Sequence, residues 1–278
     1  MPEGDTIFRT ARTLRRVLAG RELTAAQTRV PGVRLLGIGR LVGQTITTVE
    51  SRGKHLLVWF APSDLALHTH MQMSGAWHTY APGERWRRPE RLAVLVLATA
   101  DAVAVCFSAP VVELLSRAQV ERHRVLAALG PDALDPAADL AEARRRLDAD
   151  PGREIGDALL DQRILAGVGN VYRCEVLHIH GVHPWTPVGV VPPATRDALL
   201  ATAQRLLQAN VGPGAFRRTT VAAPGGGRSQ PAGRARRHHV YGRARRPCRR
   251  CATPIRTARQ GPQARVTYWC PRCQPSGG

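Results

Sequence analysis

Lysine is almost absent from this sequence. Of the 40 lysine and arginine residues only one, Lys54 in the segment SRGKHLL, is a lysine. A GC-rich genome that depletes lysine codons explains the arginine background, but it does not explain this one exception. An ammonium group can give up a proton, whereas a guanidinium stays charged and matches the fork geometry of phosphates and carboxylates. Lys54 is therefore a candidate for a role that arginine does not fill.

Long apolar runs and an apolar leader segment are absent as well. The first twenty residues mix acidic residues with arginines, and the longest aliphatic run, LAVLVLA near residue 95, has the length of a strand rather than of a membrane span. Apolar residues still make up 44% of the 278 residues, which is enough for real hydrophobic cores. We expect a soluble intracellular protein with no membrane partner.

Acidic residues are missing from the whole chain after residue 197. That part contains sixteen arginines, so the first 197 residues carry only +3 of the net charge of +19. Such a field attracts nucleic acid by neutralising phosphates and releasing counterions, although an acidic protein or a membrane surface would be attracted too. The charge predicts a polyanion-binding end and leaves its partner open.

Hydrophobic periodicity predicts an α+β chain. Residues 5–20 form an amphipathic helix with Asp5 as its N-cap and Gly20 just beyond its end. The apolar face of this helix consists of Ile7, Ala11, Leu14 and Val17. Residues 21–112 read as short β segments separated by Gly, Pro or charged turns, which is typical of a sandwich. From residue 113 onward the pattern becomes helical.

Four of the six cysteines form two C-x2-C pairs separated by eighteen residues. Two such pairs supply four thiolates to a closed tetrahedral site, which can fold a short segment that lacks its own core. The predicted ligands of one structural Zn²⁺ are Cys248, Cys251, Cys270 and Cys273. The segment between the pairs reads as a β-hairpin. Cys106 and Cys174 lie in apolar patterns, so we expect them to be buried.

The chain starts MPEGDT, so removal of the first methionine would expose the secondary amine of Pro2. An α-amine titrates near ~8, which leaves a useful fraction unprotonated at physiological pH. Such an amine can attack a sugar C1′ and form an iminium, and Glu3 is close enough in sequence to act as acid or base. Taken alone, a proline in second position is common.

Four separated motifs together resemble one family of enzymes. MPEG, SRGKHLL, GVGN and ARVTYWCPRCQ occur in the order found in the formamidopyrimidine-DNA glycosylase and endonuclease VIII family of base-excision repair. The resemblance spans the whole chain. It implies an N-terminal β-sandwich with a leading helix, a central helix-two-turns-helix domain and a C-terminal four-cysteine zinc-finger hairpin. We place these at residues 1–120, 121–211 and 240–278, with a flexible Arg/Gly/Pro-rich loop at 212–239.

The resemblance also implies roles for individual residues. Pro2 is similar to the Schiff-base nucleophile and Glu3 to the proton donor that assists base loss. Lys54 resembles the family's hairpin lysine, which contacts phosphate and serves in β-elimination. Arg265 resembles the zinc-finger arginine assigned to δ-elimination. Asn170 matches the asparagine that contacts backbone phosphate, and an ordinary N-cap of the following helix is compatible with that role.

Two further residues are expected to contact a flipped-out nucleotide. Gln72 resembles a DNA-contacting glutamine of endonuclease VIII proteins. Met73 lies where the family inserts an apolar side chain into the gap left by the flipped nucleotide. Packing in a core explains a methionine in a strand nearly as well.

The chain departs from the family at Asp5 and Thr6, where proline and glutamate are usual. Formamidopyrimidine-type members carry an Arg and a Phe that probe the opposite base on a later loop, and the corresponding segment here is FSAPVVELLS.

These features predict a bifunctional DNA glycosylase and abasic-site lyase of the endonuclease VIII type. We expect it to bind damaged double-stranded DNA as a monomer, to excise oxidised pyrimidines through a Pro2 Schiff base with β,δ-elimination, and to reside in the bacterial cytoplasm on the nucleoid. Two alternatives remain at this point. One is a formamidopyrimidine-type glycosylase for oxidised purines such as 8-oxoguanine, and the other is a non-catalytic zinc protein that binds damaged DNA.

Overall fold

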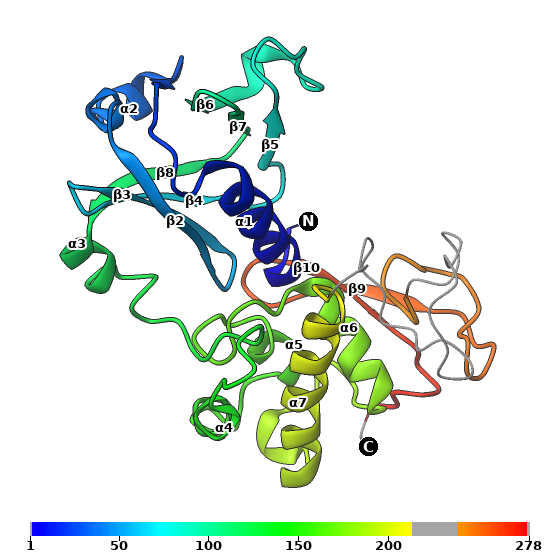
Figure 1. The fold of residues 1–278 in the computed structure, drawn as a ribbon. Helices are drawn as coiled ribbons and strands as arrows, with labels where there is room; N and C mark the ends of the chain where they lie inside the picture. Colours follow the sequence, from blue (N-terminus) through cyan, green and yellow to red (C-terminus); the bar gives the residue numbers. More distant parts are fainter. Residues whose placement is uncertain (1, 213–237, 277–278) are drawn as a thin grey trace. The chain divides into compact units, whose positions relative to one another are not determined.

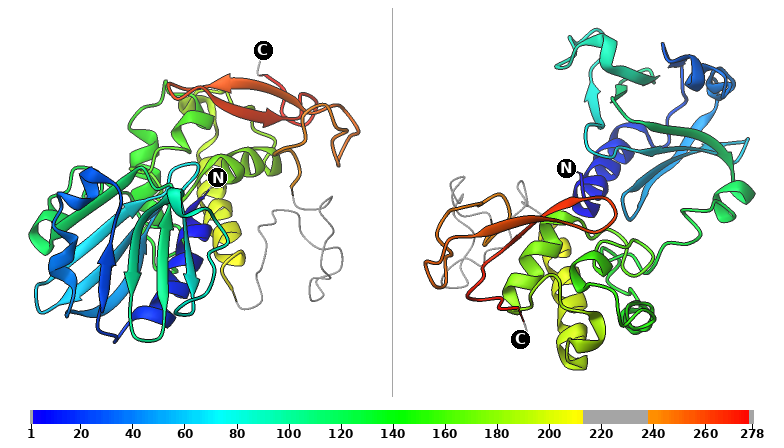
Figure 2. Two further views of the ribbon diagram at one scale, coloured as in Figure 1. Left: turned by 90° about the horizontal axis from the view of Figure 1, so that it is seen from above. Right: turned by 180° about the vertical axis from the view of Figure 1, so that it is seen from behind.

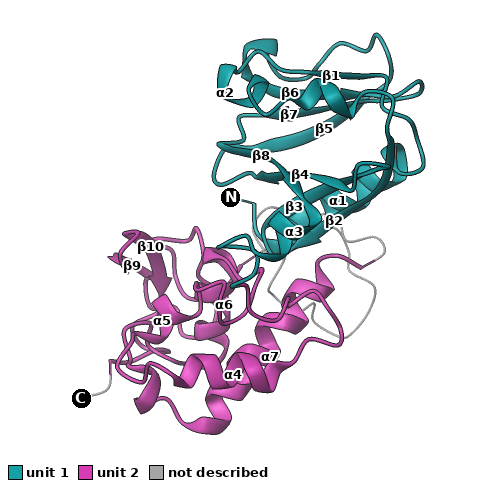
Figure 3. Cartoon of the chain, turned by 90° about the vertical axis from the view of Figure 1, so that its left-hand side faces the viewer, with its two compact units in different colours: residues 1–128 teal, residues 129–278 magenta. Residues whose placement is uncertain are grey.

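The computed structural model describes residues 2–212 and 238–276, and the chain divides into two compact units (Figure 1). Unit 1 spans residues 1–128 and unit 2 spans residues 129–278 (Figure 3). The finer division at residues 120, 211 and 239 stays a prediction. Most of the expected loop 212–239 lies outside the described residues.

Unit 1 is built from one long helix and two antiparallel sheets. Its elements are α1 (Gly4–Leu18), β1 (Ala25–Gln27), α2 (Pro31–Arg34), η1 (Ile38–Leu41), β2 (Thr45–Arg52), β3 (His55–Ala61), β4 (Leu65–His70), β5 (Ala76–Tyr80), η2 (Glu90–Leu92), β6 (Ala93–Ala98), β7 (Val103–Phe107), β8 (Val111–Ser116) and α3 (Arg117–Glu121). One sheet has the strand order β1-β6-β7-β5 and the other β2-β3-β4-β8. The predicted sandwich with a leading helix is confirmed.

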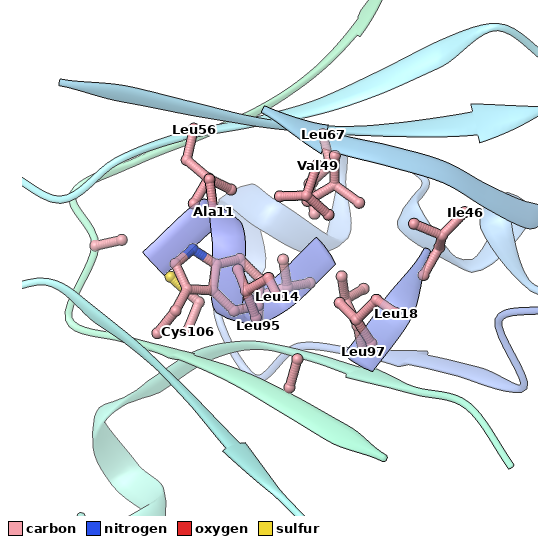
Figure 4. Close-up of a cluster of buried hydrophobic side chains, with 14 of the residues drawn as sticks. Ala11, Leu14, Leu18, Ile46, Val49, Leu56, Leu67, Leu95, Leu97 and Cys106 are labelled. Atoms are coloured by element: carbon pink, nitrogen blue, oxygen red, sulfur yellow. The ribbon is translucent and has the colours of Figure 1, made fainter. Parts of the chain in front are cut away.

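The core of unit 1 lies between the two sheets. Leu56 and Leu67 point inward from one sheet and Leu95 and Leu97 from the other, and α1 contributes apolar side chains between them (Figure 4). Because side chains alternate along a strand, His55 and His68 face the opposite side of their sheet. That outer side is covered by α3 and the residues that follow it, where the Arg117 guanidinium stacks over the Trp59 ring at 4.3 Å.

The leading helix differs from its prediction at its first turn. Its N-cap is Glu3, and Asp5 lies buried inside the helix instead of capping it. Gly20 follows the helix with a φ of +76°, as expected of a residue beyond a C-cap. The buried face includes Leu18, while Val17 is only partly buried.

The prediction that helical structure begins at residue 113 is wrong. The segment VVELLS forms strand β8, which pairs antiparallel with β4 from Leu65↔Ser116 to His70↔Val111. Helix α3 starts only at Arg117, after a capping box in which Ser116 and Gln119 bond each other's backbone. Pairing with a buried neighbouring strand decides the structure here, because local propensity is a weak constraint.

Unit 2 combines helices with a two-stranded hairpin. Its elements are α4 (Leu140–Asp148), α5 (Ile155–Ala158), α6 (Asn170–Ile179), η3 (Val188–Val190), α7 (Pro193–Ala209), β9 (Arg256–Gln260) and β10 (Arg265–Trp269). Strands β9 and β10 form the predicted hairpin (Figure 2). No helix among the described residues has both the length and the apolarity of a membrane span.

Candidate functional site

The start of α1 and the turn between β2 and β3 lie at the same end of unit 1. Gly20 N donates to Ile46 O at 2.8 Å, and Arg15 Nε donates to Val49 O at 2.7 Å. The helix therefore runs antiparallel to β2. Eleven residues of helix lead from Arg15 back to the start of α1, and four residues of strand lead from Val49 forward to the turn. Both stretches cover roughly 15 Å, so the start of α1 and the turn lie at the same level.

Pro2 and Glu3 stand at that end. Pro2 is partly exposed, whereas the Glu3 side chain is fully buried. The Glu3 backbone carbonyl starts the helix by accepting from Thr6 N at 2.9 Å and from Ile7 N at 3.1 Å. Because the cap is made by backbone groups, the Glu3 carboxyl group is not used as a side-chain cap.

The two positions that depart from the family pattern bond each other. Thr6 Oγ1 donates to Asp5 Oδ1 at 3.4 Å, and Arg9 Nη2 pairs with Asp5 Oδ2 at 3.3 Å. The Asp5 side chain is completely buried. Asp5 thus provides a buried carboxylate in the first turn of the helix, and its charge is paired with an arginine one turn further along.

Lys54 occupies the second position of a two-residue hairpin turn. The strands pair up to Arg52↔His55, and Gly53 has a φ of +57° while Lys54 does not have a positive φ. A positive φ at the first loop residue alone is the type II′ pattern, which favours glycine there. The turn holds Lys54 at the very tip of the sheet.

Gln72 and Met73 lie at the same edge, just after β4 ends. His70 pairs with His55, so the end of β4 lies beside the start of β3. The chain then turns tightly, because Gly75 N donates to Met71 O at 2.8 Å and a Cβ on Gly75 would approach the Met71 backbone to 2.7 Å. The Met73 side chain is 62% exposed, which rules out the alternative that it packs in a core.

A layer of histidines lies behind this edge on the outer side of the sheet, and no sequence motif predicted it. His55 Nδ1 is 2.9 Å from His68 Nε2, and His68 Nδ1 is 2.7 Å from Glu113 Oε2. His123 Nε2 lies 3.2 Å from the same Glu113 oxygen. The alternation in HTH placed His68 and His70 on one strand face, but nothing in the sequence linked them to Glu113.

Two histidines on this side of the sheet, His55 and His70, are held in their neutral form. Burial lowers the pKa of His55 to about 3, with further lowering by His70 and His68. Burial also lowers the pKa of His70 to about 4, with His68 and Lys54 adding to the effect. The charge of Lys54 also lowers the pKa of both rings.

Asn170 begins α6 in unit 2 and joins this helix to the hairpin. Its Nδ2 donates to Val266 O at 2.8 Å, and its Oδ1 accepts from Arg173 Nη2. The N-cap is Gly169, so the alternative that Asn170 is an ordinary N-cap is wrong by one residue. With its side chain only 6% exposed, Asn170 fixes the strand that carries Arg265.

Arg265 is the first residue of β10 and pairs with Gln260 across the hairpin. Its Nε donates to Gln263 Oε1 in the turn at 3.1 Å. The hairpin is anchored through Gln260, whose Nε2 donates to Pro184 O at 2.8 Å and to Glu154 Oε2 at 2.9 Å. Arg265 therefore projects from a strand that is tied to the helical part of unit 2.

The four cysteines of the two C-x2-C pairs come together. Sulfur distances are 3.4 Å for Cys251–Cys270, 3.5 Å for Cys251–Cys273 and 3.9 Å for Cys248–Cys273. Tetrahedral zinc with Zn–S bonds of about 2.3 Å requires sulfurs about 3.8 Å apart, so the cluster fits such an ion with small adjustments. Arg250 N also donates to Cys248 Sγ at 3.4 Å, as in a metal-binding knuckle. The cluster is consistent with a metal site.

Glu175 on α6 fixes the start of the cysteine-containing segment. Its carboxylate accepts three backbone N–H groups, from His239 at 2.7 Å and from Val240 and Tyr241 at 2.8 Å each. Glu175 is completely buried. No residue pattern indicates this contact, because the partners are backbone groups more than sixty residues away.

The predicted site residues thus fall into two sets. Unit 1 holds Pro2, Glu3, Lys54, Gln72 and Met73 at one end of the sandwich. Unit 2 holds Asn170, Arg265 and the four cysteines around α6 and the hairpin. Each set is internally ordered by hydrogen bonds and strand pairing.

Known proteins match both units. Residues 1–110 match the formamidopyrimidine-DNA glycosylase N-terminal domain, and residues 129–220 match the formamidopyrimidine-DNA glycosylase H2TH domain. The chain is 46% identical over 278 residues to a probable endonuclease 8 2 of Streptomyces coelicolor, covering 99% of this chain and 94% of that protein. It is 40% identical over 274 residues to the DNA-(apurinic or apyrimidinic site) lyase Nei2 of Mycolicibacterium smegmatis, covering 99% of each.

Solved structures share the fold. The formamidopyrimidine-DNA glycosylase of Lactococcus lactis, crystallised with DNA that contains an abasic site, superposes with a TM-score of 0.81 at 22% identity, covering 99% of this chain and all of that one. The predicted fold is confirmed by this likeness. Together with the full-length relatives above 30% identity, it shows that the chain belongs to the formamidopyrimidine-DNA glycosylase and endonuclease VIII family.

Proposed function

We propose that this endonuclease VIII-like DNA glycosylase and abasic-site lyase of base-excision repair works through the amine of Pro2 and prefers oxidised pyrimidines. The observation that carries the proposal is the meeting of Pro2, Glu3 and Lys54 at one end of unit 1. An amine, a buried carboxyl group and a lone lysine at one edge are the groups that imine chemistry on a sugar requires.

The covalent step begins when Met1 has been removed. The Pro2 nitrogen attacks C1′ of the flipped nucleotide, the bond from C1′ to the base breaks, and the base leaves with a proton. The sugar ring opens to an iminium, for which Glu3 donates the proton to the ring oxygen. Loss of a C2′ proton then expels the 3′ phosphate, and a second elimination expels the 5′ phosphate.

The remaining residues hold the DNA. Lys54 contacts phosphate and assists the first elimination, and Arg265 grips the flanking phosphates for the second. Asn170 lies at the start of α6, where backbone N–H groups favour a phosphate. Exposed Gln72 and Met73 enter the gap left by the flipped nucleotide, which offsets part of an unstacking cost of roughly a few kcal/mol.

The partner in this proposal is damaged double-stranded DNA, which one copy of the chain binds. Support comes from the net charge of +19 and from relatives of the same fold crystallised with DNA containing an abasic site or Fapy-dG. The cysteine cluster holds one Zn²⁺, which shapes the hairpin and takes no part in the reaction, because four thiolates leave no open position. The family relatives are bacterial, in keeping with a protein that works on the nucleoid in the cytoplasm.

Borohydride trapping tests the nucleophile. Reduction of the iminium should link the untagged protein to a labelled duplex that contains an abasic site or thymine glycol. Pro2→Gly should weaken the adduct, and a residue added ahead of Pro2 should abolish it while DNA binding remains. Cleavage of abasic DNA by a protein with a blocked N-terminus would show that the mechanism is wrong.

The same assay tests the substrate preference. Glu3→Gln should lose trapping on thymine glycol but keep some on the abasic duplex, where no base has to leave. Stronger trapping on 8-oxoguanine opposite cytosine would assign the chain to oxidised purines. No adduct on any duplex, despite measurable binding, would leave a protein that only binds damage.

A further inference from the structure

The histidine layer of unit 1 forms one continuous chain of hydrogen bonds. It links His55 on β3, His68 on β4, Glu113 on β8 and His123 in the segment after α3. His55 directly follows Lys54 at the hairpin turn. His123, at the far end of this chain of hydrogen bonds, lies in the segment that covers the outer side of the sheet.

The proton positions along this chain follow from its backbone contacts. His123 Nδ1 accepts from Leu126 N at 3.2 Å and from Val125 N at 3.3 Å, so this nitrogen carries a lone pair. In a neutral ring the other nitrogen then carries the proton. His123 Nε2–H therefore donates to Glu113.

The tautomers of His68 and His55 follow in the same way. Glu113 as a carboxylate only accepts, so His68 donates through Nδ1–H at 2.7 Å. His68 Nε2 is then the acceptor for His55 Nδ1–H at 2.9 Å. Consequently Nε2 of His55 keeps its lone pair, and each proton in the chain points towards Glu113.

This assignment also decides between a hydrogen-bond chain and a metal site. His68, Glu113 and His123 offer three ligand atoms within 4.8 Å of one another, a donor set that suits a transition metal ion. Binding a metal through His123 Nε2 would require a proton on Nδ1, facing the two backbone N–H groups that now donate to it. The backbone contacts therefore favour the hydrogen-bond chain.

We propose that His68, Glu113 and His123 are positioning residues for Lys54 and act through His55. This inference rests on the proposed role of Lys54 in elimination. The chain holds His55 neutral, with an acceptor nitrogen, in the residue next to an ammonium group. It also anchors the first residue of β3, and with it the turn that carries Lys54.

The charged and titratable groups around this end make the arrangement necessary. His70 faces His55 from β4, with the two ring centroids 4.6 Å apart, and Lys54 directly precedes His55 at the turn. A proton on any of these rings would repel the others and the lysine. One carboxylate, Glu113, orients the layer without adding a positive charge next to Lys54.

Substitution Glu113→Gln is the sharpest test, because it removes the charge to which two histidines donate. His68 Nδ1 and His123 Nε2 lie against the same oxygen, Oε2, and a neutral amide is a weaker acceptor than a carboxylate. His68 is then no longer held in one tautomer, and His55 can become a donor at Nε2. The matched control is Glu50→Gln in strand β2 of the same sheet. Glu50 has a similarly exposed side chain, 32% against 38%, and accepts from Trp59 Nε1 and from Arg52 instead of from a histidine.

The expected result is a loss of elimination rate without a loss of binding. Glu113→Gln should slow single-turnover cleavage of an abasic duplex about 10-fold while its Kd for that duplex stays unchanged, since misplacement of a reacting group affects rate first. Nitrogen NMR of the imidazoles should show that the tautomers of His55 and His68 change. Glu50→Gln should change neither the rate nor the tautomers.

Other outcomes would overturn the inference in distinguishable ways. Cleavage by Glu113→Gln at the rate of Glu50→Gln, or slower cleavage with unchanged tautomers, would show that the histidine layer only supports the fold. Lys54→Ala, assayed alongside, should be slower than either variant. If Lys54→Ala cleaves normally, the proposed role of Lys54 fails and the inference fails with it. Borohydride trapping of all variants reports the Pro2 step separately.

Discussion

The sandwich of unit 1 and the cysteine-containing segment 238–276 hold their proposed DNA-facing residues by different means. Lys54 stands on a sheet with a large apolar core, to which α1 and both sheets contribute. Arg265 stands on a hairpin whose cluster of buried residues offers two aliphatic side chains of its own, Val240 and Ile255, among the described residues. The other members of that cluster are cysteines, and one of them belongs to α6.

This difference has a physical reason. A segment of about forty residues cannot bury enough apolar surface to fold alone, so it depends on a metal or on contacts with a larger body. Here the four sulfurs form a cluster that fits a metal, and the segment is also held by the buried hydrogen bonds of Asn170, Glu175 and Gln260. The sandwich needs neither, and the comparison predicts that the two regions respond to different perturbations.

Loss of the metal site should have the largest effect and should be confined to the hairpin segment. In Cys270→Ser the fourth ligand is lost, and on the order of 10 kcal/mol of metal-binding free energy is no longer available to fold the segment. Metal analysis should find no tightly bound zinc, and limited proteolysis should cut within residues 238–276. The thermal transition of the sandwich should stay where it was.

The matched control for this prediction is Cys106→Ala. Cys106 is completely buried in the sandwich core and lies outside the four-cysteine cluster. This variant should keep its zinc and lose only sandwich stability. A Cys270→Ser protein with one tightly bound zinc and an uncut hairpin would contradict the dependence on metal.

Much of this contrast could be predicted from the sequence, because it depends on local spacing. The two C-x2-C pairs predicted the sulfur cluster, and short alternating segments predicted the sandwich. Strand β8 was missed for a specific reason. VVELLS has a charged residue in an apolar run, which resembles a helix, and it forms a strand because it pairs along its whole length with the neighbouring strand β4.

The contacts that sequence reasoning did not find all join distant parts of the chain. His68 and Glu113 are 45 residues apart, and Glu175 and Val240 are 65 apart. Pairing register decides the first contact, and the backbone N–H groups used in the second leave no trace in residue type. As the one lysine of the chain, Lys54 stands out by residue type. His68 and Glu113 have no such distinguishing feature in the sequence.

A cavity in the sandwich core should have the next largest effect. Leu14 on α1 is 1% exposed and lies among the side chains of both sheets (Figure 4). Leu14→Ala should cost about 3 kcal/mol, because the lost methyl groups leave a cavity that the sheets fill only in part. Urea unfolding should show this loss in the sandwich transition, while zinc content and the protease resistance of residues 238–276 remain unchanged.

Leu35→Ala provides the comparison for this change. Leu35 is 88% exposed, so the same truncation should shift stability by no more than about 0.5 kcal/mol. Equal losses in the two variants would mean that burial in the sandwich does not determine its stability. Release of zinc from Leu14→Ala would mean that the two regions unfold together.

The smallest of the three effects concerns the polar anchor of the hairpin segment. Glu175→Gln keeps the shape of the side chain but replaces one acceptor oxygen by an NH2 group, which then faces a backbone N–H donor of His239 or Val240. Losing a charged acceptor and leaving a buried donor unpaired should cost about 2 kcal/mol. Hydrogen exchange of the amides at 239–241 should speed up, and the zinc should dissociate faster while the sandwich amides keep their protection.

Glu142→Gln, on the surface of α4 with arginine partners only, should leave all of these rates unchanged. If Glu175→Gln leaves exchange at 239–241 as slow as before, the metal alone holds the segment, and the hydrogen bonds from α6 contribute only orientation.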